Sequence, residues 1–509
     1  MRGKEYLIAL DAGTTSIKAV VFDEEGTEVY IASASSNVIS DKRGFVELDM
    51  ELLWKKAARC IRESIEGSRI EKNNIRAVSV CGQGEGCWLL DRNGVPVSNA
   101  ILWSDNRAAD IVQDIKRNKN LYDEIKKTTG SYPRPGATIV LLKWYKENRP
   151  NEFNRAAYCV SCKDWLRYKI TSELMCEVTD ASTSYIDIVS KAFPVDLFGK
   201  LGIAGVEAKF PKLLSPSAKG GYVTASAAKE TSLPVGLCVS GGMLDIVSTS
   251  VGTGAIEIGD ICTILGTSCI NEMVTDTFVF QENMTGWERH FVDGLFVNVA
   301  GAMAGTPNLD WAMINILGKK KFSKQFTAEL ESTLSKIPVG SNGLIYHPYV
   351  SLAGERAPFF NSSATGHISG IKTTTTTNDI LRSVYEGVAL SSRDCLSGFE
   401  IKKRIFLSGG GSRSDFWAQI FADCIGCEVV VGEGEEFCAK GGAISAAIAS
   451  GMYRTASEAV KKFCRIKKRF EPNEANRKRY DEMYSIYWEM RKQFESFWAW
   501  RENFLNVNN

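Results

Sequence analysis

The sequence predicts an α/β protein made of two similar halves. Segments with strand-like and helix-like spacing of apolar residues alternate up to about residue 245, which is typical of an α/β fold. A strand, a short Gly-Thr turn and a second strand open the chain around residues 13–15, and the same order returns around residues 266–268. We therefore expect a first domain over residues 1–247 and a second over residues 248–509.

The elements of the first half follow from its apolar pattern. Residues 6–10 form a predicted strand, and residues 17–23 return as a second strand after the turn. Residues 52–65 have the spacing of a helix with one apolar side. Residues 75–81 and 86–91 are predicted strands around a glycine-rich bend.

The second half begins with a similar hairpin. Residues 261–265 and 269–274 are predicted strands on either side of its turn. A third glycine cluster, residues 408–412, follows another strand and precedes a predicted helix over residues 415–425. The tail, residues 471–504, has helical periodicity and predicts one or two closing helices.

Composition and charge exclude several classes of protein. Of the 509 residues, 44% are hydrophobic and 24% are charged, as in an ordinary globular protein. The formal net charge of +1 gives no overall attraction to nucleic acid or to a membrane surface. No apolar run reaches the roughly 18 residues of a membrane span, and the first residues lack the layout of a signal peptide. We expect a cytoplasmic protein with neither nucleic acid nor membrane as a partner.

The glycine turns have the composition that a phosphate site needs. Backbone N–H groups approach phosphate oxygens closely where side chains are small, and Thr and Ser hydroxyls add donors. One Gly-Thr turn is common in any protein, so the evidence lies in three turns spread over both halves. Asp11, at the end of the first strand, is either a turn residue or a carboxylate that holds Mg²⁺ beside phosphates. Lys18 is either an exposed strand lysine or a group that neutralises phosphate charge.

Asp245 follows two glycines inside an apolar segment. A buried carboxylate without a partner costs free energy, so Asp245 is either hydrogen-bonded structurally or kept for function. A carboxylate that faces a cleft can accept the proton of a substrate hydroxyl during phosphoryl transfer. Asp245 is therefore a candidate catalytic base.

At these residues the chain resembles the FGGY family of carbohydrate kinases, and the resemblance covers nearly its whole length. The matching strings are LDAGTTSIK at 10–18, LWSDNR at 102–107, LGTS at 265–268, GERAP at 354–358, GHISGI at 366–371, DILRSVYE at 379–386 and LSGGGSRSDFW at 407–417. The occurrence of all these strings in this order is highly specific for that family.

The resemblance implies a fold and a set of functional residues. The fold is two actin-like (ribonuclease H-like) domains hinged around an ATP cleft. Asp245 matches the catalytic base, and Asp11 matches the acid near Mg²⁺. The implied ATP-binding residues are Gly13, Thr14, Thr15 and Lys18, then Gly266, Thr267 and Ser268, and at the adenosine Gly410, Gly411 and Ser412. The implied activity is ATP-dependent phosphorylation of a hydroxyl on a small sugar or sugar alcohol.

The acceptor pocket is expected mainly in the first half. The implied substrate-binding residues are Gln83, Gly84, Glu85, Trp103, Asp105 and Asp245, with Arg107 nearby. Polar groups of this kind bind hydroxyls, while an indole offers an apolar wall to C–H groups. Asp105 and Arg107 have the alternative of a structural ion pair, and Trp103 that of a core residue.

The expected substrate depends on positions where this sequence differs from individual branches of the family. Gly84 and Glu85 stand where glycerol kinases carry Arg-Glu and D-xylulose kinases carry Met-His. The surroundings of Gln83 and Asp245 resemble instead the erythritol kinase and L-xylulose kinase branches. We expect a four- or five-carbon polyol or ketose, with erythritol or L-xylulose favoured and glycerol or D-xylulose as alternatives.

Other classes of protein stay open on the sequence alone. A non-catalytic actin-like ATP-binding protein and a sugar sensor share the nucleotide turns. A dinucleotide oxidoreductase also has glycines after strands, although the first turn lacks the Gly-x-Gly-x-x-Gly pattern. The oligomeric state is open too, with a homodimer as one option.

Overall fold

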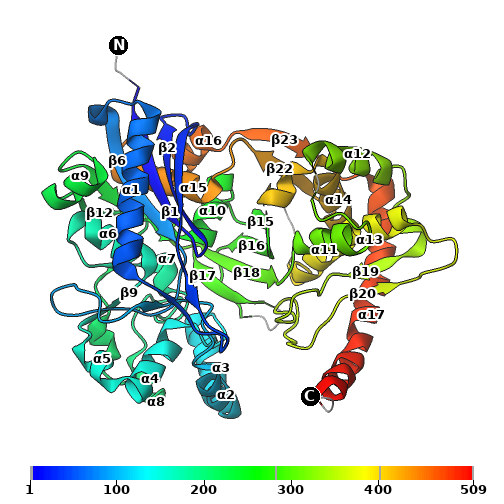
Figure 1. Cartoon of the computed structure of the whole chain (residues 1–509), viewed down its shortest axis with the longest axis horizontal. Helices are drawn as coiled ribbons and strands as arrows, with labels where there is room; N and C mark the ends of the chain where they lie inside the picture. Colours follow the sequence, from blue (N-terminus) through cyan, green and yellow to red (C-terminus); the bar gives the residue numbers. More distant parts are fainter. Residues whose placement is uncertain (1–3, 281–283, 322, 400–402, 507–509) are drawn as a thin grey trace.

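Two seven-stranded mixed sheets, one from each half of the chain, organise the protein (Figure 1). The computed structural model describes residues 4–280, 284–321, 323–399 and 403–506. In spatial order the first sheet contains β12 (Lys219–Tyr222), β13 (Cys238–Ser240), β6 (Ile75–Gly82), β1 (Tyr6–Ala12), β2 (Ser16–Asp23) and β3 (Glu28–Ser35), and β14 (Met243–Leu244) also pairs with β6. The second contains β17 (Gly286–Arg289), β18 (Phe296–Ala302), β16 (Cys269–Thr275), β15 (Ile261–Leu265), β21 (Arg404–Ser408), β22 (Glu428–Gly432) and β23 (Ile466–Phe470).

The two halves repeat one arrangement, as the sequence predicted. In the first, β1 pairs antiparallel with β2 across the turn at residues 13–15 and parallel with β6. In the second, β15 pairs antiparallel with β16 across the turn at residues 266–268 and parallel with β21. Because parallel strands end at the same edge of a sheet, the segments that follow β1 and β6 lie together, and so do those that follow β15 and β21.

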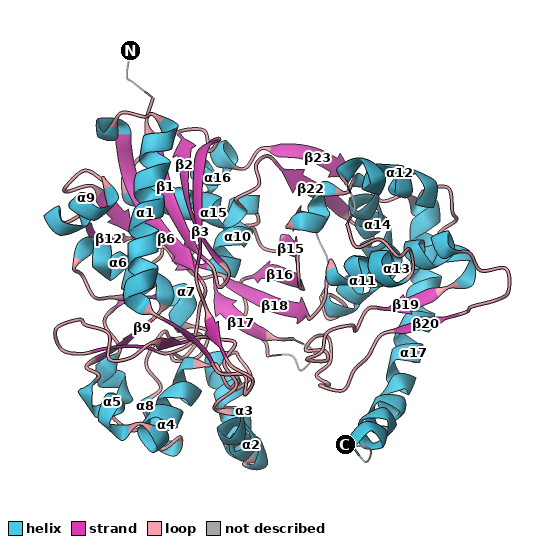
Figure 2. Ribbon diagram, in the orientation of Figure 1, coloured by secondary structure: helices cyan, strands magenta, loops and turns pink. Residues whose placement is uncertain are grey.

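Helices α10 (Asp245–Thr253) and α15 (Phe437–Ala449) lie between the two sheets (Figure 2). They approach closely, since a Cβ at Gly441 would lie 1.9 Å from the carbonyl oxygen of Ser248. Apolar residues of α15 share one core cluster with Leu7 and Ala9 of β1. A helix from the C-terminal part of the chain therefore covers the first sheet, together with α16 (Ala456–Phe463).

The outer faces of the sheets are covered by further helices. On the first sheet these are α1 (Met50–Ser68), α6 (Cys162–Thr171) and α9 (Ala225–Thr231). In the second half they are α11 (Pro307–Asn315), α12 (Lys324–Leu334), α13 (Thr377–Cys395), α14 (Asp415–Ile425) and α17 (Glu474–Asn506). The predicted helix over residues 415–425 is confirmed with its bounds, and the tail forms the single long helix α17 (Figure 1).

A smaller lobe, drawn in cyan and green below the first sheet in Figure 1, has its own apolar core. Its helices are α2 (Ala109–Arg117), α3 (Lys119–Thr129), α4 (Thr138–Asn148), α5 (Pro150–Arg155), α7 (Val178–Ala181) and α8 (Val195–Lys200). The first half also has three small sheets. One joins β4 (Ile39–Ser40), β5 (Val46–Leu48) and β8 (Ala100–Ile101), another joins β7 (Trp88–Leu90) and β9 (Tyr158–Val160), and the third joins β10 (Cys176–Glu177) and β11 (Leu213–Leu214). In the second half, β19 (Ile345–His347) pairs with β20 (His367–Ser369). Within the part of the chain that the structure describes, no helix combines the length and hydropathy needed to span a bilayer.

Candidate active site

Two cavities are lined by residues from both halves of the chain. The first, which we call the Asp245 cavity, has a volume of about 490 Å³ and is lined by, among others, Thr14, Gln83, Trp103, Arg134, Asp245, Ser268 and Glu288. The second, which we call the Gly410 cavity, has a volume of about 970 Å³, and its lining includes Lys18, Thr306, Gly410, Gly411, Ser412 and Glu436. Most of the predicted site residues are therefore brought to one of two neighbouring regions.

Asp245 is the first residue of α10 and directly follows β14, the short strand beside β6. Its Oδ1 accepts a hydrogen bond from the N–H of Ile246 at 2.8 Å. Burial, followed by the negative charges of Asp11 and Asp180, raises the pKa of Asp245 to about 7. A carboxyl that ionises near neutral pH is suited to take a proton from a hydroxyl.

Asp11 lies near the end of β1, opposite Lys18 in the antiparallel pair with β2. Burial raises the pKa of Asp11 to about 6, while the positive charge of Lys18 lowers it. The Lys18 ammonium itself is 2.7 Å from Glu436 Oε2. Asp11 and Asp245 are thus two partly buried acids that interact unfavourably when both are ionised, and a divalent cation near them would relieve this repulsion.

The first predicted phosphate turn contributes to both regions. Thr14 Oγ1 donates to Gln83 Oε1 at 3.1 Å and accepts from Trp103 Nε1 at 2.9 Å, so its side chain belongs to the Asp245 cavity. Thr15 is exposed at the tip of the turn, and the Gly13 carbonyl accepts from Ser36 Oγ at 2.8 Å. The backbone of the turn, rather than the Thr14 hydroxyl, is therefore what remains free to face phosphates.

The second predicted turn lies between the two cavities. Ser268 lines the Asp245 cavity, whereas the Gly266 carbonyl accepts from the N–H of Thr306, which lines the Gly410 cavity. Thr267 is exposed between them. The third glycine cluster forms the 3₁₀ helix η4 (Gly410–Arg413) directly after β21 and lines the Gly410 cavity.

Gln83, Gly84 and Glu85 follow β6 directly and line the Asp245 cavity. The buried Gln83 Nε2 has no hydrogen-bond partner among the described residues, so it is a donor available to a ligand. A Cβ at Gly84 would lie 2.2 Å from Leu244 Cδ1 and 2.9 Å from Asp180 Oδ1, so any other residue here would require both side chains to shift. The Glu85 carboxylate is 2.8 Å from Arg134 Nη2, and both residues line the same cavity.

Trp103 lines the cavity, but Asp105 and Arg107 do not take part in its lining. Arg107 Nε and Nη2 each lie 2.9 Å from a different oxygen of Asp105, and both side chains are fully buried. Asp105 Oδ2 also accepts from the N–H of Val46, and Arg107 Nη2 is 2.8 Å from Glu47 Oε1. Asp105 therefore forms the structural ion pair that was its alternative, and its role in substrate binding stays a prediction.

Glu288 is a cavity residue that the sequence analysis missed. It lies on β17, is buried, and its Oε2 has no hydrogen-bond partner among the described residues. Burial raises the pKa of Glu288 well above its usual range, although the charge of Arg134 lowers it. The signal in the sequence was a charged Glu-Arg-His run in a segment that otherwise has strand character.

Both halves of the chain match models of one protein family. Models of the FGGY family of carbohydrate kinases match residues 6–252 with the N-terminal domain and residues 262–450 with the C-terminal domain. The chain is similar to a probable L-xylulose kinase of Pasteurella multocida, with 29% identity over 459 residues that cover 87% of this chain and 90% of that protein. It is 27% identical to the erythritol kinase of Brucella abortus, over 98% of each chain.

Solved structures share the fold. The crystal structure of xylulose kinase from Rhodospirillum rubrum superposes with a TM-score of 0.88 and 25% identity, over 97% of this chain and all of that one. The predicted two-domain α/β fold and the predicted resemblance are therefore confirmed. Since the two family models together span most of the sequence, the chain belongs to the FGGY family of carbohydrate kinases.

Proposed function

We propose that this protein transfers the γ-phosphoryl group of ATP to a hydroxyl of a four- or five-carbon polyol or ketose, with erythritol or L-xylulose favoured and glycerol or D-xylulose as alternatives. The observation that carries the proposal is Asp245, a partly buried acid that lines a cavity formed by both halves and has a pKa of about 7. The relatives named L-xylulose kinase and erythritol kinase support the acceptor class.

The acceptor would occupy the Asp245 cavity. The unpaired Gln83 Nε2 donates to one of its hydroxyls, and Glu288, whose neutral form is favoured because burial raises its pKa, would bind another. Trp103 gives an apolar wall to the C–H side of the molecule. A four- or five-carbon polyol is uncharged and has enough hydroxyls to form hydrogen bonds with both Gln83 and Glu288.

ATP would occupy the Gly410 cavity, with its adenosine at Gly410, Gly411 and Ser412. The phosphates then extend toward Lys18 and the turns that contain Gly13, Thr15, Gly266 and Thr267. Ser268 and Thr14 stand on the acceptor side of these turns, which brings the γ-phosphate to the boundary of the two cavities.

Asp11 would hold Mg²⁺, directly or through water. Among the described residues no three His, Cys, Asp or Glu side chains gather as metal ligands. One carboxylate together with phosphate oxygens and water is the usual coordination of Mg²⁺ in such sites. When bound, the cation neutralises charge on the phosphoryl group.

In the proposed step the acceptor hydroxyl oxygen forms a bond to the γ-phosphorus. Its proton passes to the Asp245 carboxylate, and the bond between the γ-phosphorus and the β–γ bridging oxygen breaks. ADP leaves with the electron pair of that bond. Closure of the halves keeps water away from the γ-phosphorus, which limits wasteful hydrolysis.

The test is the substitution Asp245→Asn, assayed by ADP release with erythritol, L-xylulose, xylitol, glycerol and D-xylulose as acceptors. We expect acceptor-dependent ADP release to fall by about 10³-fold, within the range that a general base contributes, while ADP binding changes by less than about threefold. Near-normal turnover in the variant refutes the role of Asp245. ADP release that no acceptor stimulates in the wild-type protein refutes the kinase proposal.

A cytoplasmic location, the boundary between residues 247 and 248, and a homodimer as one option for the assembly stay predictions.

A further inference from the structure

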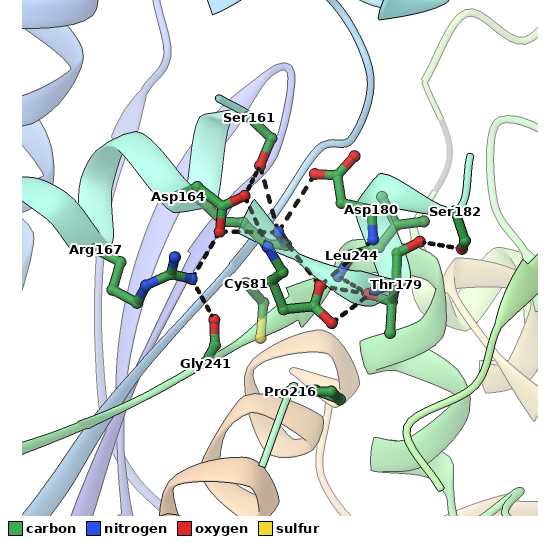
Figure 3. Close-up of polar contacts among 12 residues, drawn as sticks. Cys81, Ser161, Asp164, Arg167, Thr179, Asp180, Ser182, Pro216, Gly241 and Leu244 are labelled. Atoms are coloured by element: carbon green, nitrogen blue, oxygen red, sulfur yellow. Dashed lines mark hydrogen bonds and ion pairs between the residues drawn. The ribbon is translucent and has the colours of Figure 1, made fainter. Parts of the chain in front are cut away.

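Five charged side chains form one buried cluster, of which Asp164, Arg167 and Asp180 are labelled in Figure 3. Lys163 Nζ is 3.3 Å from Asp164 Oδ1, 3.3 Å from Glu177 Oε2 and 3.5 Å from Asp180 Oδ2. Arg167 Nη1 lies 2.6 Å from Asp164 Oδ1. All five side chains are buried, which is costly unless each charge is paired. We call this group the Lys163 cluster.

The first link from the cluster leads to the loop of Glu85. Asp180 Oδ1 accepts the backbone N–H of Glu85 at 3.0 Å. Glu85 has a φ of 57°, a conformation that non-glycine residues seldom adopt and that needs support from its surroundings. The same Asp180 oxygen lies 2.9 Å from where a Cβ at Gly84 would be, so the loop is packed directly on this carboxylate.

The second link leads to the segment of the catalytic base. Thr179 Oγ1 donates to Glu177 Oε2 at 2.6 Å and accepts the backbone N–H of Leu244 at 3.0 Å. Leu244 immediately precedes Asp245. Arg167 adds a further anchor, because its Nη1 donates to the Gly241 carbonyl at 2.7 Å, just before β14 (Figure 3). The backbone on which Asp245 stands is therefore tied to the cluster.

The third link crosses to the second sheet. Ser182 Oγ accepts the backbone N–H of Arg289 at 2.9 Å and donates to the Thr179 carbonyl at 2.7 Å. Arg289 follows Glu288, the cavity residue of β17. The short helix α7 and the residue after it thus touch three walls of the Asp245 cavity, namely the Glu85 loop, the Leu244–Asp245 segment and β17.

We propose that Thr179, held by the Lys163 cluster, is a positioning residue that fixes the backbone of Asp245 for phosphoryl transfer. This inference rests on the proposed function of Asp245. Apolar side chains often stabilise a core as well as a buried ion cluster does, so stability alone does not account for five buried charges at this place. The cluster instead supports the cavity backbone: Asp180 binds the Glu85 N–H, Arg167 binds the Gly241 carbonyl, and Glu177 holds the Thr179 hydroxyl that binds the Leu244 N–H.

The decisive variant is Thr179→Val, which keeps the shape of the side chain and removes the hydroxyl. With the acceptor that gives the fastest ADP release, we expect kcat to fall about 10- to 100-fold, the scale of a misplaced catalytic group, while the KM for ATP stays within about twofold. Thr179→Ser restores the hydroxyl and should return kcat to within about threefold of the wild-type value. A kcat for Thr179→Val within twofold of wild type, or a Thr179→Ser variant as slow as Thr179→Val, overturns the inference.

A matched control comes from a buried threonine away from the cavity. Thr231 Oγ1 also accepts a backbone N–H, that of Leu233 at 3.2 Å, and donates to the Ala227 carbonyl at 2.7 Å. Thr231→Val should lower the thermal midpoint by a similar amount and leave kcat within about twofold. If Thr231→Val slows the reaction as much as Thr179→Val, general destabilisation explains both, and the inference fails.

Two further measurements keep the test independent of folding and of the proposed function. If Thr179→Val does not fold, Ser182→Ala takes its place, with an expected fall in kcat of about five- to tenfold and no change in the KM for ATP; an unchanged kcat overturns the inference.

Hydrogen exchange at the Leu244 amide of the unliganded protein should be about tenfold faster in Thr179→Val, since a hydrogen bond is lost. An unchanged exchange rate contradicts the inference, whereas absence of ADP release from the wild-type protein contradicts only the proposed function.

Discussion

Lys18 and Glu436 are 418 positions apart in the sequence, and their side chains form an ion pair with 2.7 Å between Nζ and Oε2. The backbone N–H of Glu436 also donates to Glu28 Oε1 at 2.9 Å. The ion pair joins β2, and the hydrogen bond to Glu28 joins β3, to Glu436, the residue that precedes α15. Both side chains line the Gly410 cavity, so the proposed ATP site contains a lysine that already has a partner.

The substitution Glu436→Gln should tighten the binding of MgATP by about three- to tenfold. It removes a negative charge from the cavity and frees the Lys18 ammonium for a phosphate. Titration calorimetry with MgATP at low ionic strength measures the change. Glu63→Gln is the control, because Glu63 pairs with the exposed Arg59 on α1, does not line this cavity, and forms a contact that solvent screens. Weaker MgATP binding in Glu436→Gln would mean that the ion pair is needed to hold the halves together.

Asp245→Asn should make the protein more stable at pH 8 even though it removes activity. The folded-state pKa of about 7 lies above the usual value of 3.8, because burial disfavours the charged form. The wild-type carboxyl therefore costs nothing below about pH 4 and costs up to about 4 kcal/mol once the pH has risen through 7. Asn stays neutral throughout, so the stability gain should appear between pH 4 and pH 7 and reach its full size at pH 8.

Denaturant unfolding of both proteins at intervals from pH 4 to pH 8 tests this prediction. Asp114→Asn is the control, since Asp114 is an exposed residue of α2 whose loss should change the free energy of unfolding by less than about 0.5 kcal/mol. A difference between wild type and Asp245→Asn that does not depend on pH would show that the Asp245 carboxyl is not held in a charge-disfavouring environment.

Glu288→Ala should raise the KM for the acceptor about 10- to 100-fold and change the KM for ATP by less than about threefold. Glu288 lines the Asp245 cavity and has an oxygen without a partner among the described residues, so its truncation leaves acceptor hydroxyls unpaired. Glu288→Gln should lose much less, because a neutral amide imitates the neutral acid that burial favours. Steady-state kinetics with the best acceptor measures both variants. If Glu288→Ala changes the KM for the acceptor no more than the KM for ATP, Glu288 does not bind the acceptor.

Local pattern predicted the elements that carry the nucleotide turns. Residues 261–265 and 415–425 are observed as β15 and α14 with the predicted bounds, and β1, β2 and β6 differ from their predictions by two residues or fewer. Apolar runs and glycine punctuation are local features of the chain, and each of these elements is decided locally. The predicted repeat of the hairpin is also visible, because both turns have the same small residues.

The parts that the sequence analysis missed depend on contacts between distant segments. Thr14 was expected at phosphates, yet its hydroxyl is engaged by Gln83 and Trp103 from two other loops. The sequence of α15, Phe437–Ala449, is apolar on nearly all sides, which indicates a buried helix. The sequence does not indicate which of the two sheets this helix covers. Lys163 gains its partners from α6, β10 and α7, so its role is visible only once these are folded together.

Asp105 has structural partners that do not belong to the Asp245 cavity. Both of its carboxylate oxygens are occupied by Arg107 and by the N–H of Val46, and its side chain is fully buried. Asp105→Asn should therefore destabilise the protein by about 3–5 kcal/mol, because it leaves the buried Arg107 with only Glu47 as a charged partner. At a temperature where the variant is folded, its KM for the acceptor should stay within about twofold of the wild-type value. Denaturant unfolding and steady-state kinetics on one preparation check the two halves of this prediction. A raised acceptor KM without loss of stability would instead mean that the carboxylate leaves Arg107 and binds the substrate when the halves close.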